Sequence, residues 1–236
     1  MTESDSNLIL ALETSGRQGS VALLRGGAVL GEGQIQANQR TAAAMTPLIA
    51  EVVHSANLEL SQVDVLGVTI GPGSFTGLRV GVTTAKTLAY VLKCEVVGVN
   101  TLDVIAHRMP ATISSVKVVL DAQRQQLFVA DYQRDNQGWM VAQQATSIVD
   151  KDAWLDSLTA GDSVTGPAVG KLTADLPADI HVVDRDLWEP TAASVAAVAL
   201  QRYQAGQRDD FWKLVPLYFR PSAAEEKLGS ASKPGG

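Results

Sequence analysis

Cysteine and basic residues are both scarce in this chain. Cys94 is the one cysteine among 236 residues, which excludes an internal disulfide framework and a zinc site built from several cysteines. A single thiol suits a reducing compartment, so we expect a cytoplasmic protein. Lysine and arginine number 19 against 25 aspartate and glutamate residues, giving a formal net charge of -6. That balance argues against a stand-alone nucleic-acid binder, which needs a basic surface to displace phosphate counterions.

Long hydrophobic runs and clustered histidines are also missing. No apolar run approaches the ~18 residues of a membrane span, and the polar opening MTESDSN lacks the features of a signal peptide. His54, His107 and His181 lie far apart in the chain, without the short spacing of a metal-binding pair. We therefore expect no membrane segment and no metal site.

The remaining composition is that of a folded protein, with 46% hydrophobic and 19% charged residues. Three apolar runs at the start predict a strand meander, and the pattern then alternates between helix and strand. The predicted strands of this first unit are 8–12, 21–24, 28–35, 63–70 and 96–99, and its helices are 41–56, 76–93 and 102–108. Thr101 is the predicted cap of the last helix. Pro47 favours a kink in the first helix over a start near Thr46.

A second unit repeats this organisation with a weaker pattern. Three strands again come first, and helices and strands then alternate. The predicted elements are strands at 117–120, 127–132, 139–141, 162–165 and 181–183, helices at 151–158 and 190–203, and a GPAVG loop at 166–170. The repeat predicts a mixed α/β protein of two similarly organised units.

The most distinctive segment is GPGSFTGLRVG at 71–81, between a predicted strand and a predicted helix. A phosphate-binding loop requires a lysine after its last glycine, and none follows Gly77. Thr76 occupies the place of the third glycine in the dinucleotide-binding motif. The turn itself consists of Gly71, Pro72, Gly73 and Ser74. From the pattern alone, a tight structural turn and a loop that binds an anion or a partner both explain these residues.

The helix after this turn carries two glycines one helical turn apart, Gly77 and Gly81. Each costs roughly 0.5–1 kcal/mol relative to alanine inside a helix, so the pair indicates close approach of another element. One face of the helix holds Gly77, Gly81, Thr84, Leu88 and Val91, and a second face holds Leu78, Val82, Ala85, Ala89 and Leu92. Burial within one domain and an interface with another subunit both explain this pattern.

Through GPGSFTGLRVG, its most specific motif, the chain resembles the TsaB family, formerly called YeaZ. The resemblance covers roughly residues 8–222 and includes LALETSGRQGSVALL, TPLIAEVV, GVNTLDVIA, LDAQRQQLFVADYQRD and PLYFRPSA in the family's order. The chain departs from the family at Glu13, where Asp is common, and at Arg40, where His is common. The resemblance implies an actin-like, Hsp70-like ATPase (ASKHA) fold of two ribonuclease-H-like domains. The expected division is a polar leader at 1–7, domains at 8–110 and 111–220, and a flexible tail at 221–236.

The resemblance also implies a non-catalytic role in making threonylcarbamoyladenosine on tRNA. In the family, the catalytic paralogue TsaD carries a metal-binding HxxxH pair and transfers threonylcarbamoyl to N6 of adenosine 37 in tRNAs that read ANN codons. The chain would bind TsaD, or a second copy of itself, through its first two long helices, and would help to dock the ATPase TsaE. Contact with tRNA would occur only through the complex. The implied interface residues are Thr41, Met45, Leu48, Ile49, Val52, Phe75, Thr76, Gly77, Leu78, Arg79, Gly81, Val82, Thr84, Ala85 and Leu88.

No cofactor is implied for this chain itself, and any ATP and magnesium would belong to the complex. The wider superfamily places a nucleotide-binding set at Thr14, Ser15, Gly16 and Asp121. An alternative function is therefore an independent actin-like ATPase or small-molecule kinase, with a magnesium nucleotide held by Thr14, Ser15 and Asp121. The subunit function is the leading prediction.

Overall fold

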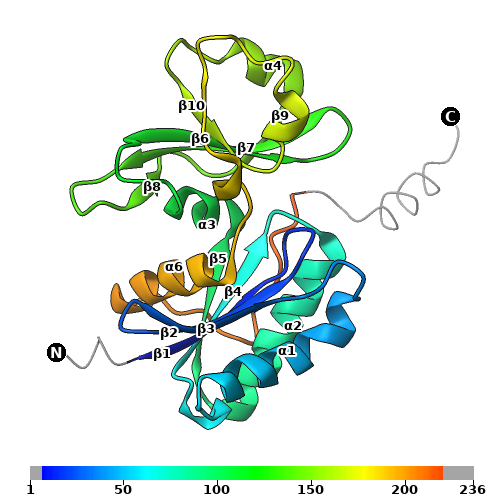
Figure 1. The fold of residues 1–236 in the computed structure, drawn as a ribbon, viewed down its shortest axis with the longest axis vertical. Helices are drawn as coiled ribbons and strands as arrows, with labels where there is room; N and C mark the ends of the chain where they lie inside the picture. The colour runs from blue at the N-terminus through cyan, green and yellow to red at the C-terminus, as the bar shows by residue number, and fades with distance from the viewer. Residues whose placement is uncertain (1–6, 220–236) are drawn as a thin grey trace, which may run out of the picture.

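The computed structural model describes residues 7–219, which form two lobes, each built around one β-sheet (Figure 1). Residues 1–6 of the predicted leader and the whole predicted tail at 221–236 lie outside the described residues. No helix within residues 7–219 is long and apolar enough to cross a membrane.

The first sheet has the strand order β3-β2-β1-β4-β5. Its strands are β1 (Leu8–Glu13), β2 (Ser20–Arg25), β3 (Ala28–Gln34), β4 (Val65–Gly71) and β5 (Glu95–Asn100). β1 pairs antiparallel with β2 and parallel with β4, so the opening meander continues directly into a parallel half-sheet. Every residue of β1 is buried. Helices cover both faces of the sheet at this strand, which explains why its sequence is apolar almost throughout.

Two long helices, α1 (Thr41–Ser55) and α2 (Phe75–Leu92), lie side by side on one face of the first sheet (Figure 1). The opposite face is covered by α6 (Ala192–Gln204), which contacts β1, β2, β4 and β5. The core of the first lobe therefore includes one apolar cluster under α1 and α2 and another under α6.

The position of α6 corrects the predicted domain boundary. By residue number the helix belongs to the predicted second domain at 111–220, but it packs on the sheet of the first lobe. Gly67 in β4 permits this packing, because a β-carbon there would lie 2.9 Å from the Cβ of Ala199 in α6. The last helix thus returns to the first lobe.

The second sheet has the order β11-β10-β6-β7-β8, with β9 paired to β7 outside this path. Its strands are β6 (Ser115–Asp121), β7 (Gln126–Arg134), β8 (Met140–Ala142), β9 (Ser147–Asp150), β10 (Ser163–Thr165) and β11 (His181–Val182). A meander again leads, and β10 and β11 then add in parallel. The main path of this sheet therefore repeats the order of the first sheet. This duplicated ribonuclease-H-like topology confirms the expected actin-like fold.

Several local predictions change. α1 begins at Thr41 and continues through Pro47, so the alternative start near Thr46 is wrong. The cap of α3 (Thr101–His107) is Asn100, whose side-chain oxygen accepts a hydrogen bond from the backbone N–H of Leu102 at 2.8 Å, and Thr101 is the first helical residue. The predicted GPAVG loop ends in a short helix, α5 (Val169–Leu172). The other short helices are α4 (Lys151–Asp156), η2 (Leu60–Gln62) and η3 (Arg185–Leu187).

A polar cluster joins the two lobes. Asp103 of α3 accepts a hydrogen bond of 2.6 Å from the hydroxyl of Tyr132 in the second sheet and forms an ion pair with Arg202 of α6. The same guanidinium donates to the carbonyl of Gly98 in the first sheet at 2.9 Å. Because these partners come from both lobes, the cluster stabilises one lobe against the other.

Residues 209–219, here called the C-terminal strap, pass along the outer edge of the first sheet. The backbone of Asp209 donates to the carbonyl of Val96 at 2.9 Å, so the strap pairs with edge strand β5. Lys86 of α2 donates to the carbonyl oxygen of Leu214 at 3.0 Å, and the backbone of Leu217 donates to Ile70 at 2.7 Å. The strap therefore flanks α2.

Candidate partner-binding surface

The glycine-rich turn between β4 and α2 packs against the loop that follows β1. Gly71 and Gly73 have φ angles of 121° and 158°, which L side chains rarely adopt. A β-carbon at Gly73 would also lie 2.5 Å from the carbonyl oxygen of Ser15. Ser74 donates its backbone N–H to that oxygen at 2.8 Å, and its hydroxyl caps α2 by accepting from the N–H of Gly77. The turn is therefore fitted to a neighbouring loop of its own chain.

The two helical glycines lie on the side of α2 that packs against the loop after β1 of the same chain. A β-carbon at Gly77 would lie 2.0 Å from the backbone oxygen of Thr14, and one at Gly81 would lie 2.2 Å from its hydroxyl. No side chain fits at these distances. The glycine pair does mark a close approach, and the residue that approaches α2 is Thr14 of the same chain. Of the two explanations offered for the pair, burial within the domain is correct.

The loop under α2 is organised by a buried carboxylate. One oxygen of Glu13 accepts hydrogen bonds from the N–H and hydroxyl of Ser15, both at 2.7 Å, and from the N–H of Gly16 at 3.0 Å. Burial raises the pKa of Glu13 above its ordinary value, and these hydrogen bonds offset part of that rise. Thr14 and Ser15 are buried as well. The Glu13 side chain therefore stabilises the turn formed by the residues that follow it.

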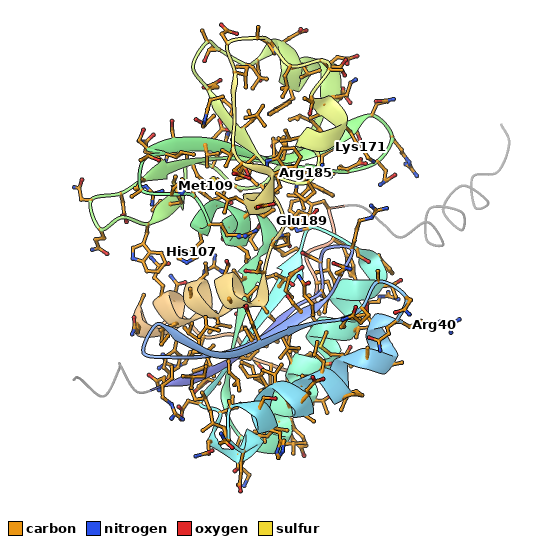
Figure 2. All side chains as sticks on the ribbon, viewed as in Figure 1. Arg40, His107, Met109, Lys171, Arg185 and Glu189 are labelled. Carbon is orange, nitrogen blue, oxygen red and sulfur yellow. The ribbon has the colours of Figure 1, made fainter. Side chains whose placement is uncertain are left out.

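The four residues of the predicted nucleotide-binding set have different surroundings. Thr14 is covered by α2 and Ser15 by the glycine-rich turn before it. Gly16 lies beside Glu189, which Figure 2 shows between the two lobes. Asp121 ends β6 in the second sheet, where it pairs with Lys171 and accepts the N–H of Gln123 at 2.7 Å. With Thr14 and Ser15 covered, their hydroxyls are not presented to a nucleotide in this structure.

The predicted interface residues divide into three groups by exposure. Eight are buried in the chain: Met45, Ile49, Val52, Gly77, Leu78, Gly81, Val82 and Ala85. Five are half-buried: Thr41, Leu48, Phe75, Thr84 and Leu88. Thr76 and Arg79 are exposed. The eight buried residues face the sheet and the loop after β1, because the apolar side of each helix covers the core, so their assignment to a partner surface is corrected.

The outward faces of α1 and α2 carry many small side chains, of which the sequence prediction selected only Thr76. Among the exposed residues are Ala42, Ala43, Thr46, Pro47, Ala50, Thr76, Thr83 and Thr87. We call this set the small-residue face. Side chains of this size let another helix approach closely. The available signal was the helical spacing of Thr76, Thr83 and Thr87, opposite the apolar side of α2.

The start of α2 is held to the C-terminal strap by Arg79. Its guanidinium lies 4.2 Å from the ring centre of Phe75, and its Nε donates to the hydroxyl of Tyr218 at 3.1 Å. The rings of Phe75 and Tyr218 are 4.8 Å apart between centroids. At the start of α1, Arg40 projects from the surface (Figure 2). Within residues 7–219, no three histidine, cysteine or acidic side chains are grouped so that they could hold a metal ion.

The duplicated sheet topology defines an actin-like protein, and comparison with known proteins narrows the class. The family model described as "TsaD: tRNA N6-adenosine threonylcarbamoyltransferase" matches residues 35–161, more than half of the chain. The Escherichia coli protein named tRNA threonylcarbamoyladenosine biosynthesis protein TsaB is 26% identical over 93% of this chain and 97% of its own length. The Bacillus subtilis protein of the same name is 30% identical, over 54% of this chain and 56% of its own.

A solved structure confirms the fold. The structure titled "YeaZ from Pseudomonas aeruginosa" superposes with a TM-score of 0.78 at 24% identity, covering 90% of this chain and all of that one. Because the TsaD family model matches more than half of the chain and the Escherichia coli TsaB matches 93% of it, the chain belongs to the TsaB (YeaZ) family.

Proposed function

We propose that this chain is a non-catalytic subunit of the cytoplasmic machinery that makes threonylcarbamoyladenosine on tRNA. It binds the catalytic paralogue TsaD through the small-residue face and, together with TsaD, provides a docking site for the ATPase TsaE. A second copy of the chain uses the same face when TsaD is absent. The tRNA is reached through the complex, and any ATP and magnesium belong there.

The observation that carries this proposal is the small-residue face itself. The buried side of α1 and α2 covers the sheet, which leaves a row of alanine and threonine side chains outside the core. An outward helix face of a monomer usually carries many charged residues. On these two helices the exposed acidic and basic residues are Glu51 and His54 of α1 and Arg79 of α2. The face therefore suits close packing against another helix pair.

The division of labour has separate support. The Escherichia coli and Bacillus subtilis relatives are both named for the biosynthesis of threonylcarbamoyladenosine on tRNA. The histidines of this chain lie in three different elements, His54 in α1, His107 in α3 and His181 in β11. A helical HxxxH pair, the metal-binding feature expected of TsaD, does not occur in the sequence. Transfer chemistry is therefore assigned to the partner.

The test is a binding and activity experiment with TsaD and TsaE from the same genome. Ala50→Arg places a long charged side chain in the middle of the small-residue face, and we expect it to abolish co-elution with TsaD in light-scattering chromatography. It should also abolish threonylcarbamoyladenosine formation on tRNA, measured by nucleoside chromatography. Ala142→Arg, on an exposed strand of the second lobe, is the matched control. Full activity of the Ala50→Arg complex would refute the proposed surface.

A further inference from the structure

A cluster of exposed apolar side chains lies where α2 ends. Tyr90, Val91 and Trp212 are 60%, 65% and 69% exposed. Tyr90 lies 5.6 Å from Trp212 and 6.1 Å from Phe211 between ring centroids, and the two strap rings are 4.9 Å apart. We call Tyr90, Val91, Phe211 and Trp212 the aromatic patch. Large apolar side chains gathered on a surface in this way mark an interaction site.

The patch is held in place from beneath. Phe211 packs against the apolar cluster under α1 and α2. Lys86 donates to the backbone oxygen of Trp212 at 3.2 Å, which ties the strap to α2 at this point. A groove of about 590 Å³ adjoins the patch and is also lined by Lys93, Cys94 and Glu95. Rings that are already fixed lose little conformational freedom on binding, and the two charged side chains give the groove a polar rim.

The patch continues the small-residue face along α2. Tyr90 follows Thr83 by seven residues and Thr87 by three, so all three project from the same side of the helix. All three side chains are exposed. A partner helix lying along Thr76, Thr83 and Thr87 would therefore reach Tyr90 at its end.

The composition of the small-residue face also calls for an anchor elsewhere on the surface. At 1.5 Å per residue, α1 and α2 are about 22 and 27 Å long, and two helices side by side present a face roughly 20 Å wide. Such a face has a footprint of about 500 Å², and it consists mainly of alanine and threonine. Alanine and threonine seldom supply the dominant binding energy, which aromatic side chains commonly provide.

We infer that the aromatic patch is the anchor of the interface with the catalytic partner, receiving apolar side chains from the end of that partner's helix pair in the groove beside Tyr90. This inference rests on the proposed function and assigns the source of most of its binding energy. The small-residue face sets the close approach of the helices, and the patch holds the complex together.

The test compares affinities for TsaD from the same genome by calorimetric titration. Tyr90→Ala and Trp212→Ala should each raise the dissociation constant at least tenfold, and the double variant should raise it further. Tyr90→Phe keeps the ring and should stay within threefold of the unchanged chain. Val141→Ala removes an exposed apolar side chain from the second lobe and is the matched control. Both ring positions are mostly exposed, so thermal unfolding of each variant should match that of the unchanged chain.

The outcomes separate this inference from the proposed function. If Ala50→Arg abolishes binding but the double variant binds within twofold of the unchanged chain, the anchor assignment is wrong and the proposed function stands. If the unchanged chain does not bind TsaD, both fail. If the double variant loses only self-association and keeps its affinity for TsaD, a second copy occupies the patch, and the assigned occupant is wrong.

Discussion

β1 in the first lobe and β6 in the second occupy the same place in their sheets, and both end in a carboxylate. Glu13 is fully buried and organises its loop through the N–H groups of Ser15 and Gly16. Asp121 is partly exposed and pairs with Lys171. Burial raises the pKa of Glu13. At Asp121 a smaller burial effect is outweighed by the hydrogen bonds and charge of its partners, which lower its pKa. The same topology thus yields opposite electrostatics, because α2 covers only the first of these loops.

The helices of the two lobes also differ, in their length. The first lobe carries helices of 15 and 18 residues, α1 and α2, with an outer face free of other elements of the described chain. The second lobe has α4 and α5, of 6 and 4 residues. Helices that short offer no extended surface. Strand order therefore sets the shared architecture of the two lobes, while helix length and loop cover decide which lobe can present a partner face.

The largest expected effect comes from disrupting the packing of α2 on the loop after β1. Gly77→Ala places a β-carbon 2.0 Å from the backbone of Thr14, and we expect a loss of at least about 3 kcal/mol in the free energy of unfolding, measured with urea. The second-lobe counterpart is Gly170→Ala in α5, where the β-carbon would lie 3.4 Å from Trp188. That change should stay within about 0.5 kcal/mol. Equal midpoints for the two variants would contradict the packing of α2 described here.

A smaller effect is expected where the lobes meet. Arg202→Ala leaves Asp103 with Tyr132 but without its cation, and the pair is partly exposed. We expect a loss of about 2 kcal/mol and a broader or two-step urea transition, because the lobes become less coupled. Tryptophan fluorescence and circular dichroism, recorded over the same urea series, would monitor the unfolding of both lobes. Lys213→Ala, which removes an exposed ion pair with Asp210, is the control. An unchanged, single transition for Arg202→Ala would show that the lobes are coupled elsewhere.

The contrast between the two carboxylates predicts opposite pH dependences. Since folding raises the pKa of Glu13 above 4.5, the stability linked to it is present below that pH and lost as the pH rises through the folded-state pKa. Glu13→Gln should therefore gain on the unchanged chain as the pH rises above 4.5. For Asp121, with a pKa lowered from 3.8, stability is present above that pH and lost as the pH falls below it. Asp121→Asn should be the less stable form at neutral pH, and the gap should close in acid.

Urea titrations of the unchanged chain and the two variants from pH 3 to pH 8 would measure these differences, since subtraction of each variant from the unchanged chain cancels other titrating groups. Slopes of the same sign for the two variants would refute the assigned electrostatics of one loop.

The smallest expected effect concerns the residue after each carboxylate. The hydroxyl of Thr14 is buried without a hydrogen-bond partner among the described residues, whereas the second lobe has Ala122 at the equivalent place. Thr14→Val keeps the shape and removes the unsatisfied group. We expect a change between zero and about 1 kcal/mol of added stability, measured by thermal unfolding. A clear loss of stability would mean that the hydroxyl has a partner that matters to the fold.

Much of the architecture was predictable because its signals are local. Period-two alternation and apolar runs located both meanders, and the spacing of three and four located α1, α2 and α6. The candidate surface was predicted only in part. The prediction and the proposed surface use the same two helices, but eight of the predicted residues lie on the buried side. The glycine pair indicates a close approach but does not identify the neighbouring element. A helix with small residues on two faces has the same sequence pattern whichever face is buried.

The amino-acid sequence by itself determined the fold class, the family and the two long helices, because hydrophobic periodicity and a specific glycine-rich motif are properties of neighbouring residues. The tertiary structure alone decided that Gly77 and Gly81 meet Thr14, that α6 returns to the first sheet and that Tyr90 and Trp212 meet at the surface. Each of these contacts joins segments more than 60 residues apart. Such contacts depend on how the elements pack together, and the local sequence pattern of one segment does not specify which distant segment it contacts.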